Sequence, residues 1–233
     1  AVARSLDRRL ISERVSFGMR APLQSLVPPP LPSATPPSWP GYSPQQARAL
    51  YRRAGFCQGR RLNLPLTFRS NVPADRLFAL TWQAQLRRDL DDCVSLEIDG
   101  VESTTAYRQL EKGAFPMILL DWSGDYPDPE IYLLPMLACA KASGSRCLAG
   151  GSAAFGSFWT APGLQRQLEA TESLQGAARQ QLLQTIQRRA AHGAAYIPVW
   201  QVAPRAWAQP SISRPEFDGS GRLLLQALSR GTP

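Results

Sequence analysis

Residues 117–132 read MILLDWSGDYPDPEIY, an apolar run that leads directly into an acidic, proline-rich and aromatic loop. Four consecutive apolar residues, 117–120, are typical of a strand covered on both faces, as in a parallel sheet. The loop then starts at the carboxyl end of that strand, which is the edge where open α/β sheets usually bind ligands. Carboxylates beside aromatic rings suit a cation such as an amine, so this stretch predicts a binding site.

An α/β pattern precedes this stretch. Alternating apolar residues predict strands over 62–68 and 94–98, and apolar residues four apart predict a helix over 78–90 between them. A short helix over 103–112 then leads to the apolar run. The order β-α-β-α-β predicts right-handed crossovers and a mostly parallel sheet flanked by helices. Pro65 lacks a backbone donor, which indicates an edge or irregular position for the first of these strands.

The first part of the chain reads as helix, linker and helix. Residues 1–15 have the pattern of an amphipathic helix, and residues 22–42 form a proline-rich linker that we expect to run extended over the surface. Ser43, Pro44 and Gln46 then predict a helix start, with the serine as N-cap and the glutamine completing a capping box.

Periodicity continues beyond the loop. Helices are predicted over 162–172 and 174–191, and a further strand over 195–202. The tail is rich in turn residues until 222–228, where a last strand is expected.

Composition excludes several classes of protein. The 233 residues carry a net charge of +8, but the arginines are scattered singly and in pairs without a nucleic-acid-reading motif, so we predict solvated helix faces and no nucleic-acid partner. No apolar run approaches a membrane span, and the first residues lack the features of a signal peptide. We therefore expect a soluble chain, at most peripheral to a membrane, whose natural start lies upstream.

Most catalytic motifs are missing from the sequence. His192 is the one histidine, it falls at a helix end, and there is no GxSxG or Walker A sequence. No paired CxxC spacing indicates zinc. The sequence thus predicts no catalytic residue, metal or cofactor. The alternative is a carboxylate-based, glycosidase-like hydrolase that would use acidic residues of the loop 121–130.

Four cysteines form two candidate pairs. Cys139 and Cys147 flank a small polar loop that a disulfide would close. Cys57 and Cys93 each precede a predicted strand, and their positions would be close if the two strands were parallel neighbours. Free, buried thiols are the alternative for both pairs.

A series of motifs, in order, resembles bacterial extracellular solute-binding proteins of family 5, the dipeptide, oligopeptide and nickel group that supplies ABC importers. The motifs are LDRRLISERVSFG (6–18), YSPQQARALYRRAGF (42–56), FALTWQAQLRRDL (78–90) with VSLEIDG (94–100), YRQLEKGAFPMILLDWSGDYPDP (107–129) and AAYIPVWQ (194–201). No single motif is decisive, but their order is specific.

The resemblance implies an α/β lobe like those of type II periplasmic binding proteins, with the first lobe missing. Residues 1–203 would form the second, C-terminal lobe, and residues 204–233 would return toward the first lobe. Such a protein captures a peptide or similar small solute in the periplasm, or lipid-anchored outside the cytoplasm, and delivers it to ABC transporter permease subunits. It would act as a monomer and not as an enzyme.

The resemblance also assigns site residues. Asp125 matches the aspartate that pairs with the ligand's α-amino group in peptide-binding members, and Trp122 matches a tryptophan that stacks on the ligand. Ser123 and Tyr126 lie beside them. The alternatives are a turn-forming aspartate that caps local amides, and a tryptophan that packs in the core.

Some positions depart from the family pattern. Asp121 stands where the family commonly has glycine, and Pro116 replaces a usual aspartate. Leu110 and Leu119 occupy places where some oligopeptide binders carry arginine for the peptide carboxylate. The mouth of the pocket and the preference for free peptides are therefore expected to differ.

Overall fold

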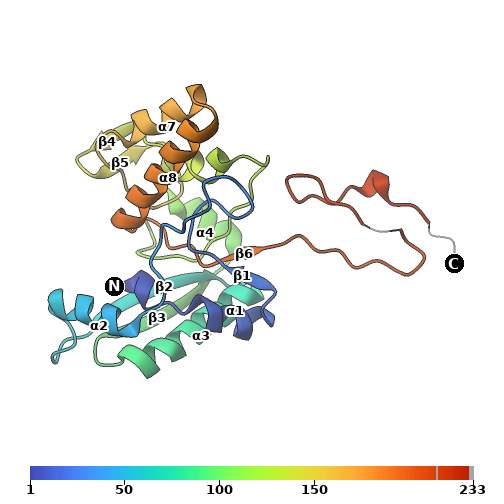
Figure 1. Ribbon diagram of the computed structural model, residues 1–233. Coiled ribbons are helices and arrows are strands. Elements are labelled where there is room, and N and C mark those ends of the chain that lie inside the picture. Colours follow the sequence, from blue (N-terminus) through green and yellow to red (C-terminus); the bar gives the residue numbers. More distant parts are fainter. Residues whose placement is uncertain (214, 231–233) are drawn as a thin grey trace.

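Two hydrophobic cores organise the chain in the computed structural model, which describes residues 1–213 and 215–230 (Figure 1). The first core lies among α1 (Arg8–Ser16), α2 (Pro44–Arg53), α3 (Pro73–Leu90), β2 (Leu62–Arg69) and β3 (Val94–Val101). The second lies among a proline-rich segment, α5 (Leu134–Leu137), α7 (Leu164–Ser173) and α8 (Gly176–Gly193). The predicted helices over 78–90, 162–172 and 174–191 are therefore confirmed as α3, α7 and α8.

The first four elements of the predicted β-α-β-α-β order, β2, α3, β3 and α4 (Ser103–Leu110), are confirmed. β2 and β3 pair in parallel from Leu62 opposite Val94 to their far ends, and α4 follows β3. On the other side of β2, Thr67 forms an isolated parallel bridge with Ile118. The Thr67 amide donates to the Met117 carbonyl at 2.9 Å. The carboxyl ends of all three segments thus meet at one edge.

The predicted strand over 117–120 needs a correction. Only this one bridge forms, and the four side chains are half-buried instead of covered on both faces. Pro65 explains part of this, because residues two apart in a strand direct their amides to the same side. Pro65 lies two residues before Thr67 and has no amide to donate toward residues 115 and 116.

The proline-rich segment does not run over the surface, and that prediction is wrong. Val27, Ala34 and Trp39 are buried in the second core. Residues 23–42 of the segment form no regular secondary structure, so some of its buried polar groups form hydrogen bonds with side chains and carbonyl groups that are distant in the sequence. Gln187 of α8 accepts a hydrogen bond from the Val27 amide at 3.2 Å, and the Trp39 indole donates to the Tyr196 carbonyl at 2.7 Å.

The predicted helix over 1–15 is interrupted. A short 3-10 turn, η1 (Val2–Arg4), comes first, and α1 begins only after Asp7. The Asp7 carboxylate accepts a hydrogen bond from the Leu10 amide at 3.0 Å, so this residue is the N-cap. The apolar pattern of the sequence runs on through Asp7 and so does not reveal that one helical element ends before this residue and another begins after it.

The start of α2 is largely as predicted. Pro44 is its first residue, and the Ser43 hydroxyl accepts a hydrogen bond from the Gln46 amide at 3.4 Å. The capping box is not completed, however, because the Ser43 amide donates to the Arg4 carbonyl at 2.8 Å. This contact joins η1 to α2.

Both predicted disulfides are present. Cys57 is bonded to Cys93, and Cys139 to Cys147. Strand register contributes to the first bond: Leu62 lies opposite Val94, which brings Cys93 to the start of β2, and a turn in which the Cys57 amide donates to the Arg60 carbonyl at 2.9 Å precedes that strand. The described residues contain no free cysteine.

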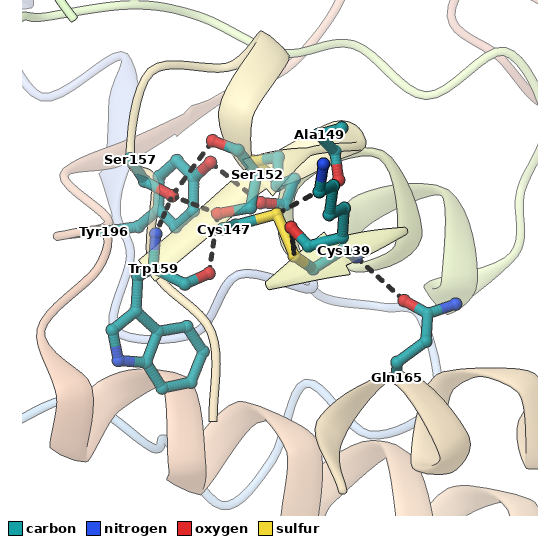
Figure 2. The surroundings of a disulfide bond; sticks show 10 residues. Cys139, Cys147, Ala149, Ser152, Ser157, Trp159, Gln165 and Tyr196 are labelled. Atoms are coloured by element: carbon teal, nitrogen blue, oxygen red, sulfur yellow. Dashed lines mark hydrogen bonds between the residues drawn. A yellow bond between two sulfur atoms is a disulfide. The ribbon is translucent and has the colours of Figure 1, made fainter. Parts of the chain in front are cut away.

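The second disulfide closes the base of a small hairpin (Figure 2). The hairpin consists of β4 (Lys141–Ser143) and β5 (Arg146–Ala149), and it leads into α6 (Gly151–Ala154). The Cys139 amide donates to the Gln165 side chain of α7 at 2.8 Å, and the Ser152 hydroxyl donates to the Trp159 carbonyl at 2.6 Å. The first bond joins the start of the hairpin to α7, and the second joins α6 to the segment that follows it.

The last described residues leave the two cores. The predicted strand over 195–202 forms only as β6 (Trp200–Val202), which pairs antiparallel with β1 (Arg20–Pro22). The chain then extends away from the body (Figure 1). The predicted strand over 222–228 is wrong, because a 3-10 turn, η3 (Leu225–Ala227), forms there, and among the described residues this stretch makes only one isolated antiparallel bridge, from Leu223 to Phe217. Within the described ranges, no helix has the length and apolar character needed to cross a membrane.

Candidate functional site

A pocket of about 430 Å³ opens at the carboxyl ends of the parallel segments. Its walls come from α4, from the loop that follows residue 120, and from the end of α6. The lining residues are Tyr107, Leu110, Asp121, Trp122, Ser123, Asp125, Ala154 and Phe155. Acidic and aromatic side chains from three parts of the chain thus surround one space.

The loop is held close to the short helix that follows it, η2 (Pro129–Tyr132). Gly124 is buried, and a Cβ at this position would lie 2.8 Å from the Ile131 side chain and 2.9 Å from the Tyr132 hydroxyl. Only glycine permits that approach without displacing its neighbours. The residues that flank Gly124, Ser123 and Asp125, both line the pocket.

Trp122 is both a core residue and a pocket wall. Its indole donates to the Ile131 carbonyl at 2.8 Å, and its ring meets the Phe155 ring edge-on, with centroids 5.1 Å apart. The side chain packs against the second core while one face lines the pocket. The two interpretations of Trp122 from the sequence are therefore compatible.

Asp125 lies at the pocket and is mostly exposed. Its carboxylate contacts the Arg222 guanidinium of the extended tail at 3.2 Å. Among the described residues it accepts no backbone hydrogen bond, unlike Asp128, whose carboxylate caps η2 by accepting from the Glu130 amide at 2.8 Å. The turn-capping role considered for Asp125 thus belongs to Asp128.

The four predicted ligand contacts do not all share the pocket. Ser123 lines it together with Trp122 and Asp125, whereas Tyr126 is 48% exposed and is not among the lining residues. Whether these side chains bind a ligand stays a prediction.

Sequence reasoning did not place Tyr107, Ala154 or Phe155 at the pocket, nor the buried Arg69 beneath it. Tyr107 and Leu110 are three apart on α4, a spacing that places them on one helix face, so this signal was available. Phe155 follows a glycine-rich stretch that gave no such signal. Arg69 is the last residue of β2, and local sequence does not single it out because its partner Asp121 lies 52 residues later in the chain.

Arg69 is buried beneath the pocket rim. Its Nε donates to the Asp75 carboxylate at 2.7 Å, and its Nη1 donates to Asp121 and to the Tyr107 hydroxyl. Burial acts to lower the pKa of Arg69, but the hydrogen bonds and charges of Asp75 and Asp121 outweigh it, and the pKa is raised above its usual value. Arg69 is therefore a permanent cation that fixes Asp121 in place.

The remaining acidic residues of the loop bind α8. Arg179 contacts the Asp128 carboxylate at 2.8 Å and the Glu130 carboxylate at 2.8 Å. The hydrogen bonds from Arg179 lower the pKa of Asp128. All four carboxylates of the loop are paired with arginine, whereas a glycosidase needs one carboxylic acid that can give its proton to the substrate. This arrangement disfavours the hydrolase alternative.

The Asp128–Arg179 pair predicts how stability depends on pH. Because the folded-state pKa of Asp128 is depressed, its contribution is present above the ordinary carboxyl pKa of about 4 and is lost as the pH falls through the folded value. Asp128→Asn should therefore reduce the loss of stability between about pH 5 and pH 2, measured by urea unfolding. Asp99→Asn, an exposed change on β3, is the control and should keep the wild-type slope. An unchanged slope in Asp128→Asn would contradict the pairing.

Solved structures share this fold. The dipeptide-binding protein of Pseudoalteromonas sp. SM9913, in complex with Met-Leu, matches with a TM-score of 0.77 at 19% identity, over 99% of this chain and 44% of that chain. NikA of Brucella suis, in complex with Fe(III)-EDTA, matches with a TM-score of 0.76 at 20% identity, over 99% and 47%. The peptide-binding pheromone receptor PrgZ matches with a TM-score of 0.78 at 13% identity, over 99% and 44%. The fold is therefore that of a lobe of a solute-binding protein.

The family follows from the sequence itself. Residues 1–144 match the model of the bacterial extracellular solute-binding proteins, family 5, in its middle region. The chain belongs to this family, as the ordered motifs indicated. A curated relative, di/tripeptide-binding protein 4 of Pseudomonas aeruginosa (strain UCBPP-PA14), is 31% identical over 105 residues, which are 43% of this chain and 19% of that protein. The chain thus spans less than half the length of each of these four proteins.

Proposed function

We propose that this chain belongs to the substrate-binding component of an ABC importer, which captures peptides or a similar small solute outside the cytoplasm and delivers them to a membrane permease. The observation that carries the proposal is the pocket at the carboxyl ends of the parallel segments, where Asp125 lies beside the Trp122 ring. Family membership supports the same function, and the curated relative is named for binding di- and tripeptides.

The chemistry of the pocket suits a peptide's amino end. The Asp125 carboxylate is exposed, and its Arg222 partner is equally exposed, so an ammonium group can compete for it. The aromatic faces of Trp122, Phe155 and Tyr107 supply apolar walls for the rest of the ligand. In a closed site, screened from water, the ammonium would form a charge-assisted hydrogen bond with Asp125.

We further propose that residues 1–203 form the second lobe of such a receptor and that residues 204–233 return toward a first lobe. The extension of the tail away from both cores supports this division (Figure 1), as does the greater length of the relatives. The two disulfides fit an oxidising compartment such as the periplasm.

The role of Asp125 is tested in the full-length protein that the gene encodes. Asp125→Asn should weaken binding of Ala-Ala by roughly 10- to 100-fold in calorimetry, because a hydrogen bond to a charged group contributes about 1.5–3 kcal/mol. N-acetylated Ala-Ala lacks the ammonium and should bind both proteins equally weakly. Asp99→Asn, on β3 outside the pocket, is the matched control. Equal affinity of Asp125→Asn and wild type for Ala-Ala would remove Asp125 from the site.

A further inference from the structure

Asp121 stands at the end of the third parallel segment and lines the same pocket as Asp125. Its side chain is 73% exposed, although its partner Arg69 is almost fully buried, with 7% of the side chain exposed. The contact therefore joins the interior of the first core to the pocket surface. A carboxylate placed in this way is unlike a mobile surface charge, because a buried group fixes its position.

The Arg69 guanidinium is largely engaged within the protein, because four of its five N–H groups donate to described residues. Its Nε and Nη2 donate to the two oxygens of Asp75, at 2.7 and 3.2 Å, which leaves Nη1 to reach Asp121 and the Tyr107 hydroxyl. One cation thus faces two carboxylates. The group as a whole keeps one negative charge, and the part of it that reaches the pocket is Asp121.

Only one oxygen of Asp121 is engaged. Arg69 and the Tyr107 hydroxyl, which donates at 3.0 Å, both bind Oδ1. Oδ2 accepts no hydrogen bond from the described residues. Since an ionised carboxylate offers acceptor sites on both oxygens, Oδ2 is free for a donor in the pocket. None of the described residues lining the pocket is basic.

We propose that Asp121 is a second ligand-binding carboxylate, which makes the pocket select peptides that carry a lysine or arginine side chain in addition to the α-amino group. The inference rests on the proposed peptide-binding function and deepens it. Asp125 would take one cation and Oδ2 of Asp121 the other. Trp122, Phe155 and Tyr107 would cover the aliphatic part of the basic side chain, and their ring faces attract a cation.

Norleucine provides the matched ligand, because it has the aliphatic length of lysine without the charge. The test compares Lys-Ala with norleucyl-Ala, and Ala-Lys with Ala-norleucine, by calorimetry on the protein as its gene encodes it. In at least one pair the lysine peptide should bind about tenfold more tightly, as one charge-assisted hydrogen bond provides. Asp121→Asn should abolish that preference and leave the affinity for the norleucine peptide within about twofold, because asparagine can still accept from Arg69 and Tyr107.

Two further variants separate binding from structural support. Tyr107→Phe removes one bond to Oδ1, so it should reduce the ratio of the affinities for the lysine and norleucine peptides. Glu97→Gln removes an exposed carboxylate of β3 that lies outside the pocket, and it should keep the full preference. An equal loss of affinity for both peptides in Asp121→Asn would assign Asp121 a structural role and overturn the inference.

The two proposals fail in different ways. If the wild type binds lysine and norleucine peptides equally, the role of Asp121 is wrong while peptide capture stands. If the wild type binds no peptide of either pair, and no Ala-Ala, the proposed function itself is wrong.

Discussion

Replacing Asp75 with alanine is expected to lower the free energy of unfolding by about 3–5 kcal/mol, because it leaves a buried arginine without its main partner. Both side chains are almost fully enclosed, with 7% of Arg69 and 4% of Asp75 exposed. Two hydrogen bonds, at 2.7 and 3.2 Å, connect them. Asp121 remains bound to the outer nitrogen of Arg69, which places the expected loss toward the lower end of the range.

The matched control removes both charges together. Arg69→Met with Asp75→Leu should recover most of the lost stability, because well-packed apolar residues often replace a buried ion pair with little change in free energy. Urea unfolding followed by tryptophan fluorescence measures all three proteins. A loss below about 1 kcal/mol in Asp75→Ala would mean that solvent reaches Arg69 and that the pair behaves like a surface ion pair.

The parallel unit was predictable because its signals are local. Alternating apolar residues fix each strand, and the order of strands and helices fixes the parallel arrangement. Register brings Cys93 next to the start of β2, and the turn in which the Cys57 amide donates to the Arg60 carbonyl then brings Cys57 close to it. The pocket edge follows likewise, since residue 121 comes directly after the third parallel segment.

The proline-rich segment was not predictable in the same way. Its composition forbids regular structure, which suggests a surface linker, yet Val27 and Trp39 are buried. The partners that permit this burial are distant: Gln187 lies 160 residues from Val27, and Tyr196 lies 157 residues from Trp39. Nothing in the local pattern indicates such contacts.

The candidate site shows the same limit. The loop carries its own carboxylates and tryptophan, so Asp125 and Trp122 could be singled out from one stretch of sequence. The charge that fixes Asp121 comes from Arg69, 52 residues earlier, and its anchor Asp75 belongs to α3. A buried arginine is recognised only when the fold brings its two carboxylates together.

Removing the Cys57–Cys93 disulfide is expected to lower the free energy of unfolding by about 4 kcal/mol, because the bond restricts a long loop in the unfolded chain. The two cysteines are 36 residues apart, and the bond holds the leading ends of β2 and β3 together. Cys57→Ala with Cys93→Ala gives the variant. Urea unfolding under non-reducing conditions measures the change.

The second disulfide provides an internal comparison. Cys139 and Cys147 are only 8 residues apart, so their removal by Cys139→Ala with Cys147→Ala should lower the free energy of unfolding by about 2.5 kcal/mol. The order of the two losses is the informative result, since loop closure predicts a greater loss for the longer loop. A greater loss for the hairpin disulfide would instead assign its main effect to the folded state, where it holds Cys139 against Gln165 of α7 (Figure 2). Full reduction of the wild type should then give the sum of the two losses, because the bonds lie in separate cores and share no partner.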